Sequence, residues 1–132
     1  MGALYAMNEP AVVLHIDDDA LFRRAVRRSF ERSGVSVIEA MHGEEGMRHA
    51  LADAPDVILL DIKMPIQDGF ETLRLLSRHE QTKSIPVVMC SSFGTKEDIA
   101  FCFHAGAKGY LIKGHHHLEE IVRYVRGMMK EG

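Results

Sequence analysis

The chain has 132 residues, of which 46% are hydrophobic and 27% charged, and its formal net charge is −3. This length fits a single domain with a core of its own. Because there is no basic excess, the composition gives no support for nucleic-acid binding. No apolar run approaches the length needed to cross a membrane, and two cysteines are too few for a disulfide framework. We therefore expect a cytoplasmic protein with reduced thiols.

Short apolar segments alternate with amphipathic segments from residue 11 onward. Strands are expected over residues 12–16, 35–39, 57–60, 87–90 and 109–112, and helices over 20–32, 44–52, 70–79, 96–105 and 118–129. This alternation predicts an α/β fold, a doubly wound sheet of five parallel strands with helices on both faces. Residues 1–10 lack the pattern of a signal peptide, so we expect a flexible tail there and one domain over 11–132.

The helical period predicts which side chains of two helices face the core. In the first helix, Leu21 falls on the same apolar stripe as Phe30 and is expected to point inward. In the fourth helix, Cys102 and Phe103 fit an inward stripe. That stripe leaves Phe101 on the exposed side of the same helix.

Polar side chains follow four of the five expected strands at the point where each strand ends. Asp17 and Asp18 follow the first strand, Asp61 the third, Ser91 the fourth and Lys113 the fifth. Because the carboxyl ends of parallel strands meet at one edge of a sheet, we expect these side chains to lie close together. The loop that opens with Asp61 is therefore the candidate reactive centre.

The chemistry of such a group is restricted by its charges. Three neighbouring carboxylates cannot all stay ionised without a cation, because like charges raise one another's pKa. Lys113 offsets one charge, and a set of oxygen ligands suits Mg²⁺ as the second cation. A carboxylate beside Mg²⁺ and an ammonium group can act as a nucleophile toward a phosphoryl group. The Ser91 hydroxyl could donate a hydrogen bond to a phosphoryl oxygen.

The joint pattern resembles the receiver domain of two-component response regulators and covers residues 12–129. The resemblance rests on Ile16-Asp17-Asp18, on Leu60-Asp61-Ile62-Lys63-Met64-Pro65 followed by Asp68-Gly69, on Ser91 after a strand, and on Ala105-Gly106-Ala107 leading to Lys113. The resemblance implies a flavodoxin-like (βα)5 fold with the strand order 2-1-3-4-5.

The resemblance also implies a role for each acid. Asp61 would be the phosphoacceptor. Asp18 and Asp61 would bind Mg²⁺ directly, together with the backbone carbonyl of Lys63. Asp17 would hold the metal mainly through water.

For the remaining site residues the resemblance implies contact with the phosphoryl group and a conformational switch. Ser91 and Lys113 would contact the phosphoryl group, and Tyr110 would match an aromatic switch that turns inward when the hydroxyl moves toward phosphate. The fourth helix, fifth strand and fifth helix would form the output surface. An exposed Phe101 on that surface suggests a contact with a partner or a second copy.

The sequence departs from the family pattern after the lysine. The family usually has proline there, often through a cis bond, whereas this chain has Gly114 followed by His115, His116 and His117. Either the bond is trans and the loop differs, or the site tolerates strain. Adjacent histidines rarely share one ion, which favours a structural role for them over a metal site. Phe93, a bulky residue near the expected phosphoryl group, predicts slow self-dephosphorylation.

The sequence thus predicts a receiver that takes a phosphoryl group from a sensor histidine kinase or histidine phosphotransfer protein onto Asp61. The phosphorylated form would bind a downstream protein through the output surface, without direct contact with nucleic acid or membrane. It is expected to be a signalling domain and not an enzyme, although it would assist its own phosphotransfer and dephosphorylation. One alternative is a phosphorylation-independent pseudo-receiver, which Gly114 supports. Another is a phosphohydrolase, which Lys63 disfavours, because such enzymes place a second acid at that position.

Overall fold

The computed structural model describes residues 11–64, 67–92 and 94–129; the expected tail over residues 1–10 lies outside these ranges, as does Phe93. A single parallel sheet contains β1 (Val12–Ile16), β2 (Ser36–Ala40), β3 (Val57–Leu60), β4 (Val87–Ser91) and β5 (Gly109–Ile112). The strands lie in the order β2-β1-β3-β4-β5. This order confirms the predicted α/β fold and the strand order 2-1-3-4-5.

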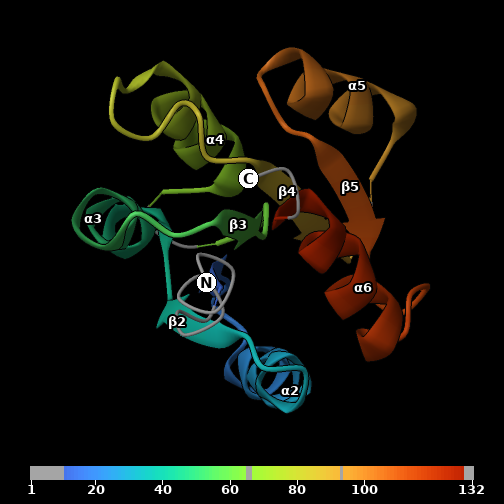
Figure 1. The fold of residues 1–132 in the computed structure, drawn as a ribbon. Coiled ribbons are helices and arrows are strands. Elements are labelled where there is room, and N and C mark those ends of the chain that lie inside the picture. Colours follow the sequence, from blue (N-terminus) through green and yellow to red (C-terminus); the bar gives the residue numbers. More distant parts are fainter. Residues whose placement is uncertain (1–10, 65–66, 93, 130–132) are drawn as a thin grey trace.

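Helices cover both faces of the sheet (Figure 1). They are α2 (Ala20–Arg32), α3 (Gly43–Asp53), α4 (Gly69–Arg78), α5 (Lys96–His104) and α6 (Leu118–Met129). One face is covered by α2 and α6, and the other by α3, α4 and α5. Each element lies within one residue of the bounds expected from the sequence. Among these helices, none is both long and apolar enough to span a membrane.

The sheet separates two hydrophobic cores. Since successive residues of a strand point to opposite faces, the wholly apolar β3 contributes to both cores. Leu59 packs in the core under α2 and α6, and Leu60 packs in the core under α3, α4 and α5. Both side chains are fully buried, so β3 is fixed at the centre of the sheet.

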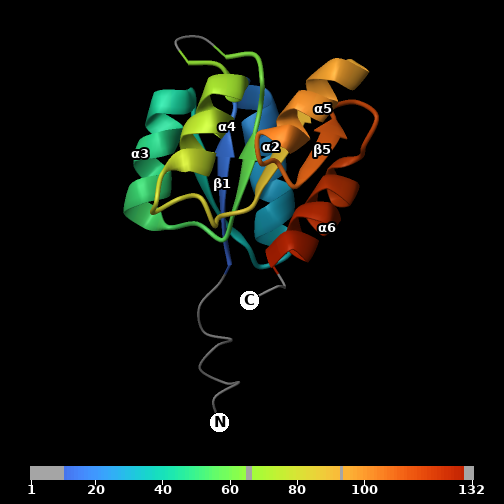
Figure 2. The same ribbon diagram turned by 90° about the horizontal axis from the view of Figure 1, so that it is seen from above.

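The strands run in one direction, so their carboxyl ends share one edge of the sheet (Figure 2). Short polar side chains begin the helices that leave this edge. Asp19 accepts hydrogen bonds from the Leu21 and Phe22 amides, both at 3.1 Å, and Asp68 accepts from the Glu71 amide at 3.0 Å. These caps satisfy free amides of the first turn and hold each helix start close to the end of the preceding strand.

Two expected side-chain directions are wrong and one is confirmed. Leu21 is 75% exposed, because the first turn of α2 presents its apolar stripe where no other element covers it. Phe103 is 47% exposed, so it does not belong to the inward stripe of α5. Phe101 is 48% exposed, as expected, although its ring makes an edge-to-face contact with Phe70, with ring centroids 5.2 Å apart.

Candidate functional site

Three acids meet at the carboxyl edge of the two central strands. Ligand oxygens of Asp17, Asp18 and Asp61 all lie within 4.8 Å of one another. The reason is the pairing of β1 with β3, in which Ile16 lies opposite Leu60 and the Asp61 amide donates to the Ile16 carbonyl at 2.9 Å. The parallel register therefore places the residues that follow these two strands side by side.

Asp61 opens the loop between β3 and α4. Its side chain is buried, and its Oδ1 accepts a hydrogen bond from the Ile62 amide at 2.8 Å. The Gly69 amide in turn donates to the Ile62 carbonyl at 2.7 Å. A Cβ atom at Gly69 would overlap the Asp61 carbonyl oxygen, so only glycine allows α4 to start this close to the acid.

Lys113 supplies the cation that the sequence placed at this edge. Its Nζ lies 2.7 Å from Asp17 Oδ2 and 3.6 Å from Asp61 Oδ2. The same Nζ lies 4.5 Å from the centre of the Phe22 ring. Burial on its own would lower the pKa of Lys113, but the hydrogen bond and charge of Asp17, together with the charge of Asp61, outweigh burial and hold the pKa above its usual value. Lys113 is therefore charged and directed at the acids.

The two buried acids have pKa values shifted in opposite directions. Burial, reinforced by the neighbouring charge of Asp17, raises the pKa of Asp61 to about 6. Burial also opposes the ionisation of Asp17, but contacts with His15 and Lys113 outweigh it and hold the pKa of Asp17 below its usual range. One ammonium group thus faces the carboxylates of Asp17 and Asp61, and with Asp18 close by the partly buried site carries an excess of negative charge.

The donor set fits a hard divalent cation. All the available ligands are carboxylate oxygens, which suit Mg²⁺, and Asp18 is exposed and able to turn toward an ion. Beside Asp18 lies a pocket of about 550 Å³, whose lining also includes Lys63, Met64 and Phe70. Lys63, whose carbonyl was predicted as a ligand, therefore borders the same space as Asp18.

Ser91 and Tyr110, the predicted switch pair, contact each other. Ser91 ends β4 and is 1% exposed, and its side chain lies close enough to Tyr110 to influence the phenol. Burial raises the pKa of Tyr110, against the effect of Ser91. A Cβ atom at Gly94 would lie 2.5 Å from the Tyr110 hydroxyl, so the ring lies against the loop that follows β4. The Lys113 amide donates to the Ser91 carbonyl at 2.8 Å. This hydrogen bond holds Ser91 and Lys113 side by side at the carboxyl edge of the sheet, where the acids lie.

The loop after Lys113 resolves one alternative left by the sequence. No cis peptide bond occurs in the described ranges, and Gly114 has φ 87°, so the loop differs from one set by a cis-proline. His116 turns back on β5, with its Nδ1 3.2 Å from the Ile112 amide nitrogen. Within the described ranges, the acids Asp17, Asp18 and Asp61 are the one group of three potential metal ligands, and no histidine of this loop belongs to it.

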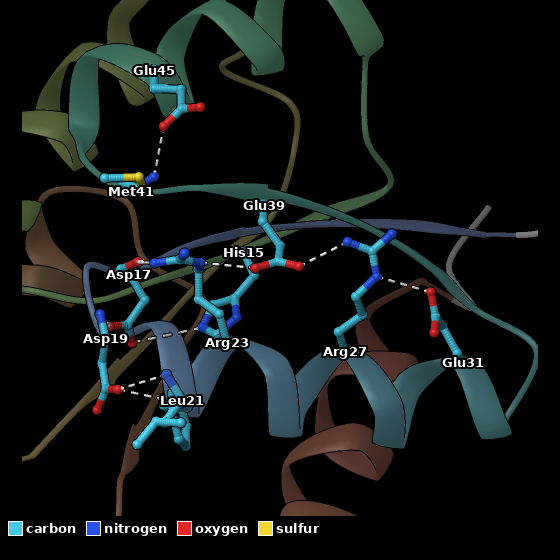
Figure 3. A network of polar contacts seen from close by, with 11 residues as sticks. His15, Asp17, Asp19, Leu21, Arg23, Arg27, Glu31, Glu39, Met41 and Glu45 are labelled. Carbon is cyan, nitrogen blue, oxygen red and sulfur yellow. Dashed lines mark hydrogen bonds and ion pairs between the residues drawn. The ribbon is translucent and has the colours of Figure 1, made fainter.

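Three residues near the acids were not expected from the sequence, namely His15, Arg23 and Glu39. His15 is fully buried with its Nε2 3.7 Å from Asp17 Oδ2, and desolvation lowers its pKa. Arg23 donates to the Asp17 carbonyl and to Glu39 (Figure 3). For His15, the presence of a histidine in an otherwise apolar strand could have indicated a functional role. The ion pair between Arg23 and Glu39 joins a helix to a strand, and no spacing of residues in the sequence indicates it.

Known proteins resemble the chain along most of its length. The family described as "Response regulator receiver domain" matches residues 13–126. The chain is 36% identical over 118 residues to the DNA-binding dual master transcriptional regulator RpaA of Synechocystis sp. and 38% identical over 107 residues to the nitrate/nitrite response regulator protein NarL of Escherichia coli. These matches cover 89% and 80% of this chain but 48% and 49% of those proteins. The chain thus spans about half the length of these curated relatives.

Solved structures agree with the family match. The chemotaxis protein CheY4 of Vibrio cholerae superposes with a TM-score of 0.85 at 28% identity, covering 91% of this chain and 99% of that one. The receiver domain of the Francisella response regulator 1452 superposes with a TM-score of 0.83 at 27% identity, covering 92% and 98%. With a sheet of the order 2-1-3-4-5 and acids gathered at its carboxyl edge, the chain belongs to the response regulator receiver domains of two-component systems.

Proposed function

We propose that Asp61 accepts a phosphoryl group from a phosphohistidine with the help of Mg²⁺, and that the phosphorylated form signals by binding a protein. The observation that carries this proposal is the placement of Asp61. It lies buried at the carboxyl edge, beside two acids and 3.6 Å from the Lys113 ammonium. Such an arrangement supplies a nucleophile and the opposite charge that a phosphoryl group requires.

The transfer follows from the two oxygens of Asp61. A carboxylate oxygen forms the bond to phosphorus while the N–P bond of the phosphohistidine breaks and its electron pair returns to the imidazole ring. Oδ1 already accepts from the Ile62 amide, and Oδ2 faces Lys113. Lys113 would neutralise charge on the arriving phosphoryl oxygens, and Ser91 would donate a hydrogen bond to one of them. Bound Mg²⁺ would supply the remaining neutralising charge.

Three groups of residues would hold the metal. Asp18 and Asp61 would contribute carboxylate oxygens directly, and Asp17 would act mainly through water. The Lys63 carbonyl would contribute a further oxygen from the loop that borders the pocket. An all-oxygen set with water in the remaining positions is the usual protein environment of Mg²⁺.

The response to phosphorylation would run through Ser91 and Tyr110. Movement of the Ser91 hydroxyl toward a phosphoryl group would break its present contact with Tyr110 and shift the ring between two positions. The downstream protein would bind the face formed by α5, β5 and α6, where Phe101 is exposed. The net charge of −3 favours a protein partner over nucleic acid for this segment.

Intact-protein mass spectrometry after incubation with Mg²⁺ and acetyl phosphate tests the proposal. We expect a gain of one phosphoryl group in the parent protein and no gain in Asp61→Asn, which keeps the shape of the side chain but lacks the nucleophile. Addition of EDTA during loading should also abolish the gain.

A parent protein that gains no phosphoryl group, from acetyl phosphate or from a phosphohistidine donor, would contradict the proposal. The pseudo-receiver would then be preferred. Turnover of phosphomonoesters would instead indicate the phosphohydrolase. The position of Lys113 beside Asp17 weighs against the pseudo-receiver, because Gly114 does not displace the lysine from the acids.

A further inference from the structure

Asp17 and Asp18 are adjacent in the chain but are held in different ways. Asp17 is buried, its amide donates to the Ala40 carbonyl at 3.0 Å, its Oδ1 accepts from the Asp19 amide at 2.9 Å, and its Oδ2 lies 2.7 Å from Lys113 Nζ. Asp18 is exposed, and its carboxylate makes no hydrogen bond or ion pair to any residue that the structure describes. The position of the Asp18 side chain must therefore be set through its backbone.

Arg23 contacts the peptide group between these two acids (Figure 3). Its Nη1 donates to the Asp17 carbonyl oxygen at 2.7 Å, and its Nε donates to Glu39 Oε1 at 2.8 Å. The Arg23 side chain is 13% exposed, so water has little access to these contacts. Glu39 lies on β2, next to β1, so the ion pair connects the start of α2 to the strand beside the acids.

Holding the Asp17 carbonyl has a consequence for Asp18. The carbonyl of Asp17 and the amide of Asp18 belong to one planar peptide group. A hydrogen bond that fixes this plane restricts ψ of Asp17 and φ of Asp18. The second of these torsions sets the direction in which the Asp18 side chain leaves the backbone. The contact from Arg23 thus bears on Asp18, whose carboxylate has no partner among the described residues.

We propose that Arg23 is a positioning residue for the divalent-cation site: oriented by Glu39, it fixes the Asp17–Asp18 peptide group and so directs Asp18 toward the ion. The proposal rests on the proposed function for the identity of the cation. Outer contacts that orient metal ligands typically change metal affinity by roughly 10- to 100-fold when they are removed. The contact from Arg23 acts on the backbone of the acids and not on their charge.

Arg27 provides a matched control on the same helix. Its Nη1 donates to Glu39 Oε2 at 2.7 Å, and its Nε donates to Glu31 at 3.0 Å. Within the described residues Arg27 makes no contact with Asp17 or Asp18. Arg27→Gln and Arg23→Gln therefore remove the same charge and one partner of Glu39 each, but only Arg23→Gln releases the carbonyl.

The experiment compares the parent protein with Arg23→Gln, Arg23→Lys and Arg27→Gln. Magnesium affinity is measured by NMR titration of the backbone amides, and amide hydrogen exchange of Asp18 and Asp19 is measured in EDTA. For Arg23→Gln we expect an affinity roughly tenfold weaker and faster exchange at Asp18 and Asp19. Arg23→Lys should recover part of the affinity, because an ammonium group can reach the carbonyl but cannot bind both acceptors in the fork geometry of arginine. Arg27→Gln should stay within twofold of the parent.

The outcomes separate this inference from the proposed function. A parent protein that fails to bind Mg²⁺ would overturn the metal site itself. If the parent binds Mg²⁺ but Arg23→Gln keeps its affinity within twofold, only the role of Arg23 is wrong. Equal losses in Arg23→Gln and Arg27→Gln would mean that helix charge, and not positioning, controls affinity. Should Arg23→Gln fail to fold, Glu39→Gln removes the acceptor that orients Arg23 and should weaken Mg²⁺ binding by a smaller factor, and an unchanged affinity there would also contradict the proposal.

Discussion

The two faces of the sheet reach its carboxyl edge with different side chains. On the face covered by α2 and α6, the strands lead into Asp17, Asp61 and Lys113. The buried His15 precedes Asp17 by two residues and points to the same face. On the opposite face the same strands end in apolar residues such as Ile16 and Leu60, which belong to the core under α3, α4 and α5. Charge is thus gathered on one face, where burial disfavours it and each group needs a partner. We therefore expect variants on the charged face to lose stability because a buried charge loses its partner, and variants on the apolar face to lose stability because atoms overlap.

The largest effect is expected when the charged face loses its cation. Lys113→Met keeps an apolar stem near Phe22 but leaves Asp17 and Asp61 without their ammonium partner. Removal of one partner from a buried ion pair leaves an uncompensated charge, so we expect a loss of about 3 kcal/mol in the free energy of unfolding. Urea unfolding in EDTA measures this loss.

A surface lysine gives the control for Lys113. Lys83 pairs with Glu80 at 3.1 Å, but both side chains are largely exposed. Lys83→Met should therefore cost less than about 1 kcal/mol. Equal losses for the two variants would mean that the charged face has no special dependence on its cation.

A smaller effect is expected where the apolar face approaches the site. In Gly69→Ala the new methyl group would overlap the backbone of Asp61 and Ile62, which cannot move as a side chain can. We expect a loss of about 2 kcal/mol in the free energy of unfolding, together with weaker phosphorylation because the Asp61 turn is displaced. Thermal or urea unfolding, followed by acetyl phosphate labelling, measures both.

Gly127 in α6 is the matched control on the opposite face. A Cβ atom there would meet nothing within 4 Å. Because glycine is a poor helix former, Gly127→Ala should stabilise the protein by up to about 1 kcal/mol. A Gly69→Ala variant as stable as the parent would show that α4 does not need its close approach to Asp61.

The smallest effect concerns the pH dependence of the ion pairs on α2. Burial on its own would raise the pKa of Glu39, but hydrogen bonds from Arg27 and Arg23 outweigh burial and hold the pKa below the usual 4.5. A carboxyl group with a depressed folded pKa adds stability above its unfolded pKa, and this stability is lost as the pH falls through the folded pKa. Glu39→Gln should therefore be less stable than the parent at neutral pH, and the gap should close below pH 4.5.

Urea unfolding of the parent and Glu39→Gln over a pH series measures this gap. Glu31→Gln is the comparison, because Glu31 is half exposed and pairs only with Arg27 among the described residues. The stability gap between the parent and Glu31→Gln should be smaller than the Glu39→Gln gap at neutral pH. A gap for Glu39→Gln that does not change with pH would mean that its ion pairs contribute no stability.

The fold and the acids could be predicted because both follow from local patterns. The apolar run over 57–60 is too short for a helix and too apolar for an exposed strand, so it had to be a central parallel strand. Once the strands are parallel, the residues after them share one edge, whatever their separation in the chain. The sequence was therefore enough to predict that Asp17, Asp61 and Lys113 lie close together.

Contacts between elements could not be predicted in the same way. The ion pair between Arg23 and Glu39 depends on how α2 lies over β2. The helix contains five arginines, and the sequence does not distinguish the one that contacts the strand from those that face solvent. Leu21 and Phe103 follow the helical period, but no neighbouring element covers them. Periodicity describes one helix, whereas burial depends on what packs against it.

Gly114 shows that the turn after the lysine selects a residue by handedness and not by size. Its φ of 87° belongs to the region that L-amino acids avoid, yet a Cβ atom at this position would meet nothing within 4 Å. The strain on an L-alanine there would come from its own backbone. A D-alanine introduced by chemical synthesis prefers the mirror-image torsions and would fit the turn without it. The turn that follows the lysine is thus selective for the handedness of the residue at this position.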